Sequence, residues 1–296
     1  MMTISNKTLS IICASVFLLG GSGILLFSHG SDQQLWLKLQ AQNLGSFLAN
    51  PAQVLGAFDG KAALPPPLKL PILMYHHVGP LPESSDALRN DLTVSPEDFE
   101  MQVAFIKGQG FNTISLQNLL DYSQGQFTLP DNPIIFTFDD GYDDAFLNAA
   151  PILKKYGLFG SFGVITQFPG ISYGTNTYAT WDQIKKAKNE GMEIVSHTQD
   201  HFDGTSEKYD NIFILRNLKD SKADLQENLG NSPDILIYPF GHYDDNYIKL
   251  AKEAGFKMGL TTEFGRTVYF DELMEIPRIR IHGNQDFETF KDLILE

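Results

Sequence analysis

The sequence predicts an α/β fold in which a parallel sheet closes fully or in part into a barrel with helices outside it. An open, doubly wound sheet is the alternative. Short apolar runs recur from Pro71 onward, and helical patterns lie between most of them, as in chains built from repeated strand and helix units. The run at residues 134–138 is apolar or β-branched throughout and stands between Pro133 and Gly141, which is typical of a strand that is covered on both faces.

Several segments of this part of the chain have the length and composition of strands. They are residues 71–75, 112–116, 134–138, 159–165, 193–196, 235–238, 256–260 and 276–281. Helical patterns cover residues 143–156, 181–190, 216–228 and 245–254. A further helix is expected after Ser95, because this N-cap residue precedes Pro96 at the first helical position and acids in the first turn, and Gly108 to Gly110 end it. This many units favours a barrel.

Residues 1–30 are predicted to be a signal peptide or a membrane anchor, an apolar helix that precedes the fold. Lys7 comes before an apolar stretch from about residue 9 to residue 27, and a positive charge in that place is typical of both. Either way we expect the rest of the chain to be exported, as an extracellular protein or one held at the cell surface by membrane association of this segment. Residues 31–70 are polar and then proline-rich, which predicts a stalk or linker.

Composition and charge exclude several kinds of partner and site. The 296 residues include 22 basic and 36 acidic side chains and carry a net charge of -14, which gives no electrostatic support to nucleic-acid binding. The single cysteine, Cys13, excludes an intrachain disulfide and a cysteine-based metal site. Any metal must therefore be held by His, Asp or Glu, and no protein partner is predicted.

Two adjacent carboxylates, Asp139 and Asp140, follow the strand expected at residues 134–138. Side chains alternate along a strand, so the two acids point in different directions and can take different roles, one on a cation and one on a proton. The alternative is that they join Asp143 and Asp144 in capping the next helix. A calcium loop of the EF-hand type is excluded, because the acids do not alternate with spacer residues.

Two histidines, His197 and His201, follow the strand expected at residues 193–196. If this segment turns helically, the four-residue spacing places both imidazoles on one face, and a carboxylate from another strand end would complete a metal site with three ligands. Surface histidines at this spacing are common, so the pattern alone leaves a surface role open. Its position directly after a buried strand favours the metal site.

Two motifs together resemble those of the polysaccharide deacetylase family, the NodB-homology domain of carbohydrate esterase family four. They are TFDDG at residues 137–141 and HTQDH at residues 197–201. Softer matches at residues 71–78, at Trp181-Asp182 and at residues 238–241 resemble the branch that contains poly-N-acetylglucosamine deacetylases. The resemblance covers residues 71–296, which it makes the catalytic domain, and it implies a distorted or incomplete (β/α) barrel.

The resemblance also implies roles for the residues at the matching positions. Asp140, His197 and His201 would bind a divalent metal, with zinc expected, and Asp139 would be the general base. Such a metal acidifies a water molecule and polarises the amide carbonyl. The backbone N–H of Phe240 would help the metal to stabilise the oxyanion.

The proton donor and the sugar contacts are less closely matched. A histidine near the end of the last strand protonates the leaving amine in the family, and His282 stands at that place, with His242 as a rival. A surface role is the alternative for either histidine. Tyr142, Trp181 and Tyr238, which lie in or beside the motifs, are the candidate substrate-binding residues.

One position departs from the family pattern. Many members carry an arginine just before the motif at Pro239, where it pairs with the catalytic aspartate, but residues 235–238 of this chain contain no basic side chain. Arg278 and Arg280 are the candidate substitutes, although arginines in a late strand are more often structural ion-pair partners.

Other polar residues near the motifs have two interpretations each. His76 and His77, at the end of the first strand, either line the pocket or pack in the core. Asp182 lies in a capping box formed by Thr180 and Gln183, where an acid in the first turn offsets the helix dipole. This structural role is favoured for Asp182 over one in the site.

The sequence therefore predicts a hydrolase that removes acetyl groups from the N-acetylglucosamine units of an extracellular polysaccharide, with poly-N-acetylglucosamine of biofilms and cell surfaces as the expected substrate. Peptidoglycan and chitin oligomers are alternatives within the same chemistry. A weakly active carbohydrate-binding matrix protein is the alternative from another class, and a glycosidase that uses the carboxylates as a pair is a third. The prediction requires Asp140 and the two histidines to meet at one point.

Overall fold

A computed structural model describes residues 64–81 and 86–295, and the residues from Leu64 onward form one compact unit. The predicted apolar segment at residues 1–30 and most of the predicted linker lie outside the described residues. The last part of that linker belongs to the compact unit, because β1 (Leu68–Lys69) pairs with β13 (Thr267–Val268) and Leu70 is buried. Within the two described ranges, no helix is long and apolar enough to cross a bilayer.

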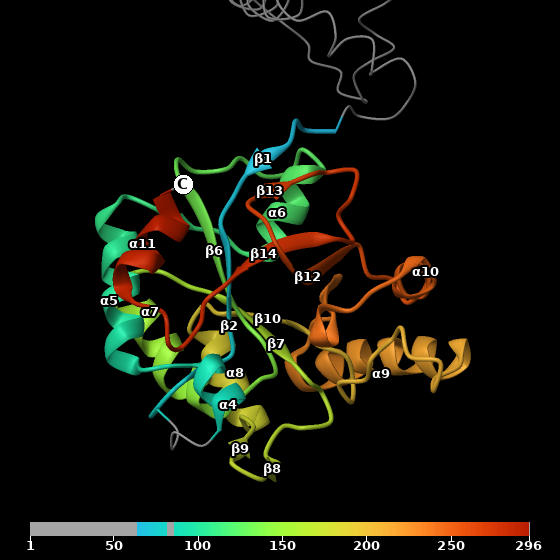
Figure 1. The fold of residues 1–296 in the computed structure, drawn as a ribbon. Coiled ribbons are helices and arrows are strands. Elements are labelled where there is room, and N and C mark those ends of the chain that lie inside the picture. The colour runs from blue at the N-terminus through green and yellow to red at the C-terminus, as the bar shows by residue number, and fades with distance from the viewer. Residues whose placement is uncertain (1–63, 82–85, 296) are drawn as a thin grey trace, which may run out of the picture. The chain divides into compact units, whose positions relative to one another are not determined.

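In the described part of the chain, seven parallel strands close into a barrel (Figure 1). In order around the ring they are β2 (Ile72–Tyr75), β14 (Ile276–Arg280), β12 (Met258–Phe264), β11 (Ile235–Ile237), β10 (Glu193–Ser196), β7 (Ser161–Val164) and β6 (Pro133–Phe138), which pairs again with β2. A break in register between Leu260 and Phe264 distorts the ring where β12 meets β14. The predicted barrel is confirmed, and the open doubly wound sheet is wrong.

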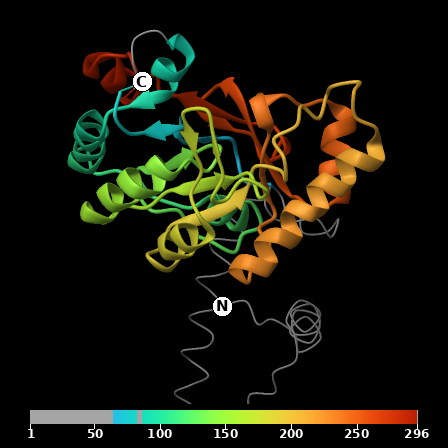
Figure 2. The same ribbon diagram turned by 90° about the horizontal axis from the view of Figure 1, so that it is seen from below.

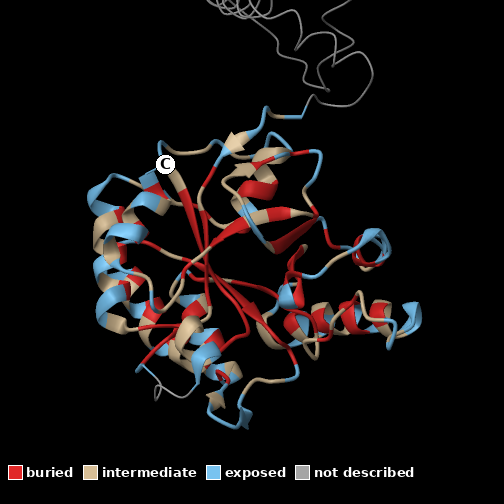
Figure 3. Ribbon diagram, viewed as in Figure 1, coloured by how far each residue is buried: buried red, intermediate tan, exposed pale blue. Residues whose placement is uncertain are grey.

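Alternate residues of each strand pack into different parts of the core, as the period of a strand requires. Ile72, Ile135 and Ile237 belong to one cluster, which draws on strands all around the ring and therefore fills the barrel. Phe136, one position along β6, packs instead in the cluster between the barrel and the surrounding helices. Figure 3 shows the strands buried along most of their length, which explains why their sequences read as continuous apolar runs.

Helices surround the barrel (Figures 1 and 2). They are α4 (Ala87–Leu92), α5 (Pro96–Gly108), α6 (Leu116–Ser123), α7 (Ala150–Lys155), α8 (Trp181–Asn189), α9 (Asn211–Leu229), α10 (Asp245–Glu253) and α11 (Phe287–Leu295), with a π-helical turn η1 (Ala145–Ala149) and a 3-10 turn η2 (Pro239–Gly241). The short strands outside the ring are β3 (His77–Val78), β4 (Thr93–Val94), β5 (Asn112–Thr113), β8 (Ser172–Tyr173) and β9 (Asn176–Thr177).

The predicted helix caps are confirmed. The Ser95 side chain accepts a hydrogen bond from the Asp98 backbone N–H at the start of α5, and Thr180 forms a reciprocal capping box with Gln183 at the start of α8. Helix α9 begins before the expected residue 216, because the Asp210 side chain caps it by accepting a hydrogen bond from Phe213 N–H. A cap residue therefore defines each of these starts more sharply than the apolar pattern does.

The strand expected at residues 112–116 is shorter than predicted, since Leu116 already begins α6. Ser115 caps this helix, and the Glu193 carboxylate of β10 accepts hydrogen bonds of 2.8 and 2.9 Å from the backbone N–H groups of Leu116 and Gln117. A carboxylate at a helix N-terminus satisfies unpaired donors and the helix dipole. The start also has a local signal, because Ser115 and Asn118 form a reciprocal capping box, which the apolar pattern of residues 112–116 does not include.

Candidate active site

Three side chains from two strand ends converge on one point. Asp140 follows β6, and His197 and His201 follow β10. The Nε2 atoms of His197 and His201 lie 3.0 and 3.2 Å from the same atom, Oδ1 of Asp140. Asp140 and His197 are buried, and His201 is partly exposed. These three residues meet as the sequence prediction required, and in the described ranges they form a group that could hold a metal ion.

The segment between the two histidines is not helical, so that part of the sequence interpretation is wrong. Thr198 and His201 have φ angles of 66° and 59°, which no right-handed helix contains. The Thr198 hydroxyl accepts a hydrogen bond of 3.0 Å from the His201 backbone N–H. This turn, rather than a helix face, brings the ring centroids to 4.9 Å from each other.

Strained backbone gathers at the same place. Among the described residues other than glycine, five have a positive φ, and four of these lie in or beside the site: Asp140, Thr198, His201 and Phe240. The left-handed conformation costs about 1–2 kcal/mol for each such residue. Strain of this kind persists where surrounding contacts enforce it and clusters at functional sites.

The donor set fits a divalent metal. His197 Nδ1 lies 2.8 Å from the carbonyl oxygen of Ile237, and a proton donated there leaves Nε2 with its lone pair directed at Asp140. A bare nitrogen that faces a carboxylate oxygen needs a cation, either a proton or a metal ion, between the two atoms. One carboxylate and two imidazoles are ligands that zinc accepts, and three protein ligands leave a coordination position open.

The neighbouring carboxylate, Asp139, points elsewhere, as alternation along the strand predicts. Arg278 of β14 donates two hydrogen bonds of 2.7 Å to it, from Nη1 to Oδ1 and from Nη2 to Oδ2. Arg278 also donates from Nη1 to the Thr137 hydroxyl and from Nε to the Thr261 carbonyl oxygen, at 2.9 and 2.8 Å. This fully buried side chain supplies the positive charge that many family members place before the motif at Pro239.

Both acids are held in their ionised form. Burial alone would raise the pKa of Asp139, but the Arg278 guanidinium outweighs burial and lowers that pKa below its ordinary value. Burial would likewise raise the pKa of Asp140, and hydrogen bonds from His197 and His201 hold it well below the usual range. The alternative in which these acids cap the next helix is wrong, because neither one binds that helix and the N-cap residue of η1, Asp144, makes no capping hydrogen bond.

The two carboxylates and the two histidines line a cavity of about 260 Å³, close to the lower end of the range for small-ligand sites. Other lining residues that matter below are His76, Tyr142, Phe240, Gly241, Thr262 and Arg280. Of the two candidate substitutes for the missing arginine, Arg280 therefore faces the cavity, and Arg278 binds the carboxylate.

Phe240 lines this cavity and has a strained backbone conformation. It has a φ of 60° and a side chain that is 53% exposed, and its backbone N–H donates to no acceptor among the described residues. The next residue is necessarily glycine, because a side chain on Gly241 would overlap Thr262 and φ is 74° there. The Phe240 ring centroid lies 4.6 Å from that of His201, and both residues line the same cavity.

The three candidate sugar-binding aromatics are not all in the cavity. Tyr142 lines it, and its ring stacks on His77 at a centroid distance of 3.6 Å. Tyr238 also contributes to the lining, but its ring is buried against Tyr243 and Tyr247. Trp181 is not a lining residue and packs against the core at the first position of α8.

The predicted proton donor does not reach the cavity. His282 is not a lining residue, is 44% exposed, and has its Nδ1 atom 2.8 Å from Oδ1 of Asp91. The rival, His242, is exposed and lies 2.9 Å from Asp203. The sequence interpretation placed His282 near the leaving group because it follows the last strand, and His242 because it lies beside the turn at Pro239. Their side chains instead lie against Asp91 and Asp203.

Of the two histidines at the end of β2, His77 packs in the core and His76 lines the cavity. His77 packs in the core, with Nδ1 at 2.9 Å from Oδ2 of Asp144. His76 lines the cavity and makes no side-chain hydrogen bond to any other described residue. Burial lowers its pKa to about 4, and the nearby Asp139 and Asp140 offset only part of this effect. The alternation of side chains along a strand is the signal that could have separated the two histidines.

Relatives of known sequence match 71–76% of this chain. The model of the polysaccharide deacetylase family matches residues 127–259. The Bacillus subtilis (strain 168) protein YxkH, named for polysaccharide deacetylation, is 30% identical over 226 residues, which are 76% of this chain and 75% of that protein. The poly-beta-1,6-N-acetyl-D-glucosamine N-deacetylase of Staphylococcus aureus (strain MRSA252) is 28% identical over 224 residues, with 71% of this chain and 73% of that enzyme covered.

Solved structures agree with this match. The Streptococcus pyogenes deacetylase PplD, in complex with acetate, superposes with a TM-score of 0.70 at 29% identity, covering 78% of this chain and all of that one. IcaB from Ammonifex degensii shares the fold, with a TM-score of 0.66 at 22% identity over 76% of this chain and 95% of the other. Together with the motifs and the site geometry, the match establishes that this chain belongs to the polysaccharide deacetylase family.

Proposed function

We propose that this enzyme is a metal-dependent N-deacetylase of an extracellular polysaccharide, and that its substrate is poly-N-acetylglucosamine. The observation that carries the proposal is the convergence of Asp140, His197 and His201 on one oxygen atom, beside a second carboxylate that Arg278 holds. The name of the Staphylococcus aureus relative supports the polymer. The apolar segment predicted at residues 1–30 supports export to the place where such a polymer lies.

Asp140, His197 and His201 would hold the metal, for which we propose Zn²⁺. When bound, such an ion lowers the pKa of a water molecule and polarises the amide carbonyl. Asp139 accepts the proton that the water loses as it attacks the acetyl carbon. Arg278 keeps this base ionised and oriented through its two hydrogen bonds.

The negative charge that develops on the acetyl oxygen requires a donor from the protein. The free N–H of Phe240 meets this requirement, since it lies at the cavity beside His201. One such donor is worth about 10²–10³ in kcat in other hydrolases. The strained φ of Phe240 fixes the direction of this N–H before substrate binds.

We propose His76, rather than the predicted His282, as the group that protonates the leaving amine. His76 lines the cavity and is neutral at pH 7, because its pKa is about 4. A neutral imidazole must first take up a proton, and the proton that Asp139 removes from water is the nearby source. His76 then delivers it to the amine nitrogen as the C–N bond breaks.

Replacing each histidine by alanine separates the two assignments. We expect His76→Ala to lower kcat for acetate release by roughly 10²-fold or more, which is the range for one acid–base group. His282→Ala should stay within about threefold of wild type, because its partner is Asp91 outside the cavity. Thermal melts show that each variant is folded. A larger loss in His282→Ala than in His76→Ala contradicts the proposed donor.

Removing the metal tests the reaction class. Acetate release from poly-N-acetylglucosamine should stop after dialysis against a chelator and return when zinc is added, because three of the site residues would lose their shared cation. Release that persists in the chelator argues against the proposed mechanism. Chitin oligomers and peptidoglycan, assayed in parallel, rank the substrates, and new reducing ends would reveal a glycosidase. Polymer binding without acetate release under any divalent ion would indicate a carbohydrate-binding matrix protein.

A further inference from the structure

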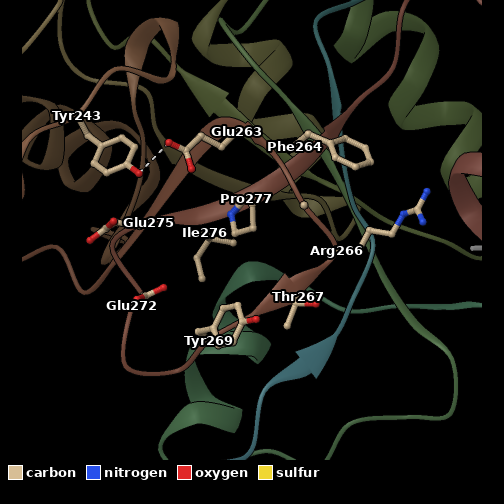
Figure 4. A pocket seen from close by; sticks show the side chains of 11 residues that line it. Tyr243, Glu263, Phe264, Arg266, Thr267, Tyr269, Glu272, Glu275, Ile276 and Pro277 are labelled. Carbon is tan, nitrogen blue, oxygen red and sulfur yellow. Dashed lines mark hydrogen bonds between the residues drawn. The ribbon is translucent and has the colours of Figure 1, made fainter.

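A second cavity, of about 300 Å³, lies along the end of β12, outside the proposed catalytic site (Figure 4). Its lining combines aromatic side chains with carboxylates: Tyr243, Phe264 and Tyr269 with Glu263, Glu272 and Glu275. Arg266 also lines it, and its guanidinium lies near the Phe264 ring. Figure 4 shows the three carboxylates on the same side as Tyr243, with Arg266 at the opposite side. We call this cavity the acidic subsite.

The acidic subsite and the catalytic cavity each share lining residues with one open hollow. Gly241 and Thr262 line both the catalytic cavity and an open hollow beside it. Tyr243 and Glu263 line both that hollow and the acidic subsite. Thr262 and Glu263 are consecutive in β12, so the end of this one strand stands between the two cavities. A polymer with one unit in the catalytic cavity can therefore place a nearby unit in the acidic subsite.

The three carboxylates of this subsite outnumber the one basic side chain in its lining, Arg266. Glu263 accepts a hydrogen bond of 3.0 Å from the Tyr243 hydroxyl. No lysine, arginine or histidine among residues 64–81 and 86–295 forms an ion pair with Glu263, Glu272 or Glu275. Unpaired carboxylates that face a cavity favour a cationic ligand, and the net charge of -14 extends this attraction beyond the cavity.

A buried hydroxyl below this wall also lacks a partner. Tyr238 is fully buried, its ring stacks on Tyr243 at a centroid distance of 5.7 Å, and its Oη makes no hydrogen bond within the described part of the chain. Burial raises the pKa of Tyr238, and the nearby Glu275 carboxylate raises it further.

We propose that the acidic subsite binds a glucosamine unit, that is, a sugar that has already lost its acetyl group. This inference rests on the proposed function, because each turnover leaves an ammonium group on the polymer. The carboxylates stabilise that ammonium and give a neutral acetamide no comparable gain. The exposed faces of Phe264 and Tyr269 offer apolar area to the sugar ring. The enzyme would therefore prefer chains that carry a glucosamine near the unit to be deacetylated.

The test uses the full chain and a series of N-acetylglucosamine oligomers of equal length. One oligomer is fully acetylated, and each of the others carries one glucosamine at a different position. We expect one position to lower KM about threefold to tenfold relative to the fully acetylated oligomer, as for exposed or half-buried charge pairs. The preference should shrink at about 1 M salt, where such pairs are screened.

Variants assign the preference to the subsite. The double change Glu272→Gln with Glu275→Gln should bring the KM ratio close to one, while Glu227→Gln, which removes an exposed carboxylate on α9, should keep the wild-type ratio. Equal KM values across the series, or a preference that the double variant retains, would overturn the inference. Calorimetric binding of a fully deacetylated oligomer, weakened in the double variant only, tests the subsite independently of turnover. Absence of acetate release from every oligomer counts against the proposed function instead.

Discussion

Replacing Asp140 by asparagine is expected to lower acetate release by roughly 10³-fold, which corresponds to the several kcal/mol of transition-state stabilisation that a catalytic metal supplies. The Asp140 Oδ1 atom is the one point that both imidazoles share, at 3.0 and 3.2 Å. Asparagine keeps the shape of the side chain and removes the charge that holds a dication. Metal content measured on the purified protein should fall together with kcat, and His197→Ala should reproduce both losses.

The matched control is Asp292→Asn, which removes an exposed carboxylate on α11 and should leave metal content and kcat within about twofold of wild type. Circular dichroism on all three variants separates loss of metal from loss of fold. If Asp140→Asn retained one metal per chain and wild-type turnover, the three converging residues would not be the metal site and the proposed mechanism would fail.

Replacing Arg278 by methionine is expected to destabilise the fold by about 3–5 kcal/mol, because it leaves Asp139 buried without its partner. For a unit of this size such a loss lowers Tm by roughly 10 °C. The activity should fall as well, since the carboxylate loses its orientation. Thermal melts and kcat on the same preparation measure both effects.

The pH dependence follows from the same contact. In the wild type, Arg278 holds the pKa of Asp139 below its ordinary value, so the pair contributes stability above the ordinary carboxyl pKa and loses it as the pH falls through the lowered one. Arg278→Met removes the largest influence that lowers the pKa of Asp139, while burial still raises it, so the acid limb of kcat/KM should move to higher pH.

A second substitution tests the cause. Adding Asp139→Asn to Arg278→Met should restore part of the lost stability, because no unpaired charge remains in the core. Arg216→Met, which removes an exposed arginine on α9, is the control and should change Tm by a degree or two at most. An Arg278→Met protein as stable as this control would show that the buried pair contributes nothing to the fold.

Much of the fold could be predicted from local patterns. The strands β2, β6, β10, β11 and β14 lie where short apolar runs end at glycines, prolines or polar residues, and the caps at Ser95 and Thr180 mark two helix starts. The start of α6 was not predicted correctly, because the apolar run at residues 112–116 was interpreted as a strand although Ser115 and Asn118 form a capping box there. What no local pattern could show is that the Glu193 carboxylate of β10 also binds the first N–H groups of this helix.

Part of the candidate site could also be predicted from the sequence, and part could not. The two acids after β6 and the two histidines after β10 could be predicted to meet, because parallel strands of a barrel end on one face. The route by which they meet was wrong in one respect, since Thr198 and His201 turn through left-handed backbone rather than a helix. The motifs also could not show that His76 lines the cavity whereas His282 lies against Asp91 outside it. Both positions depend on tertiary packing.

By itself the sequence determined the family, the barrel and the grouping of Asp139, Asp140, His197 and His201 after two strand ends. These depend on short apolar periods and on motifs whose members are close in the chain. Only the tertiary structure decided that Arg278 replaces the missing arginine, across 139 residues of sequence, and that Glu263, Glu272 and Glu275 line one second cavity. Contacts of this kind arise when barrel closure brings β14 and β12 beside strands far away in the chain. The residues next to a side chain in the sequence do not indicate which distant residue it will contact in the fold.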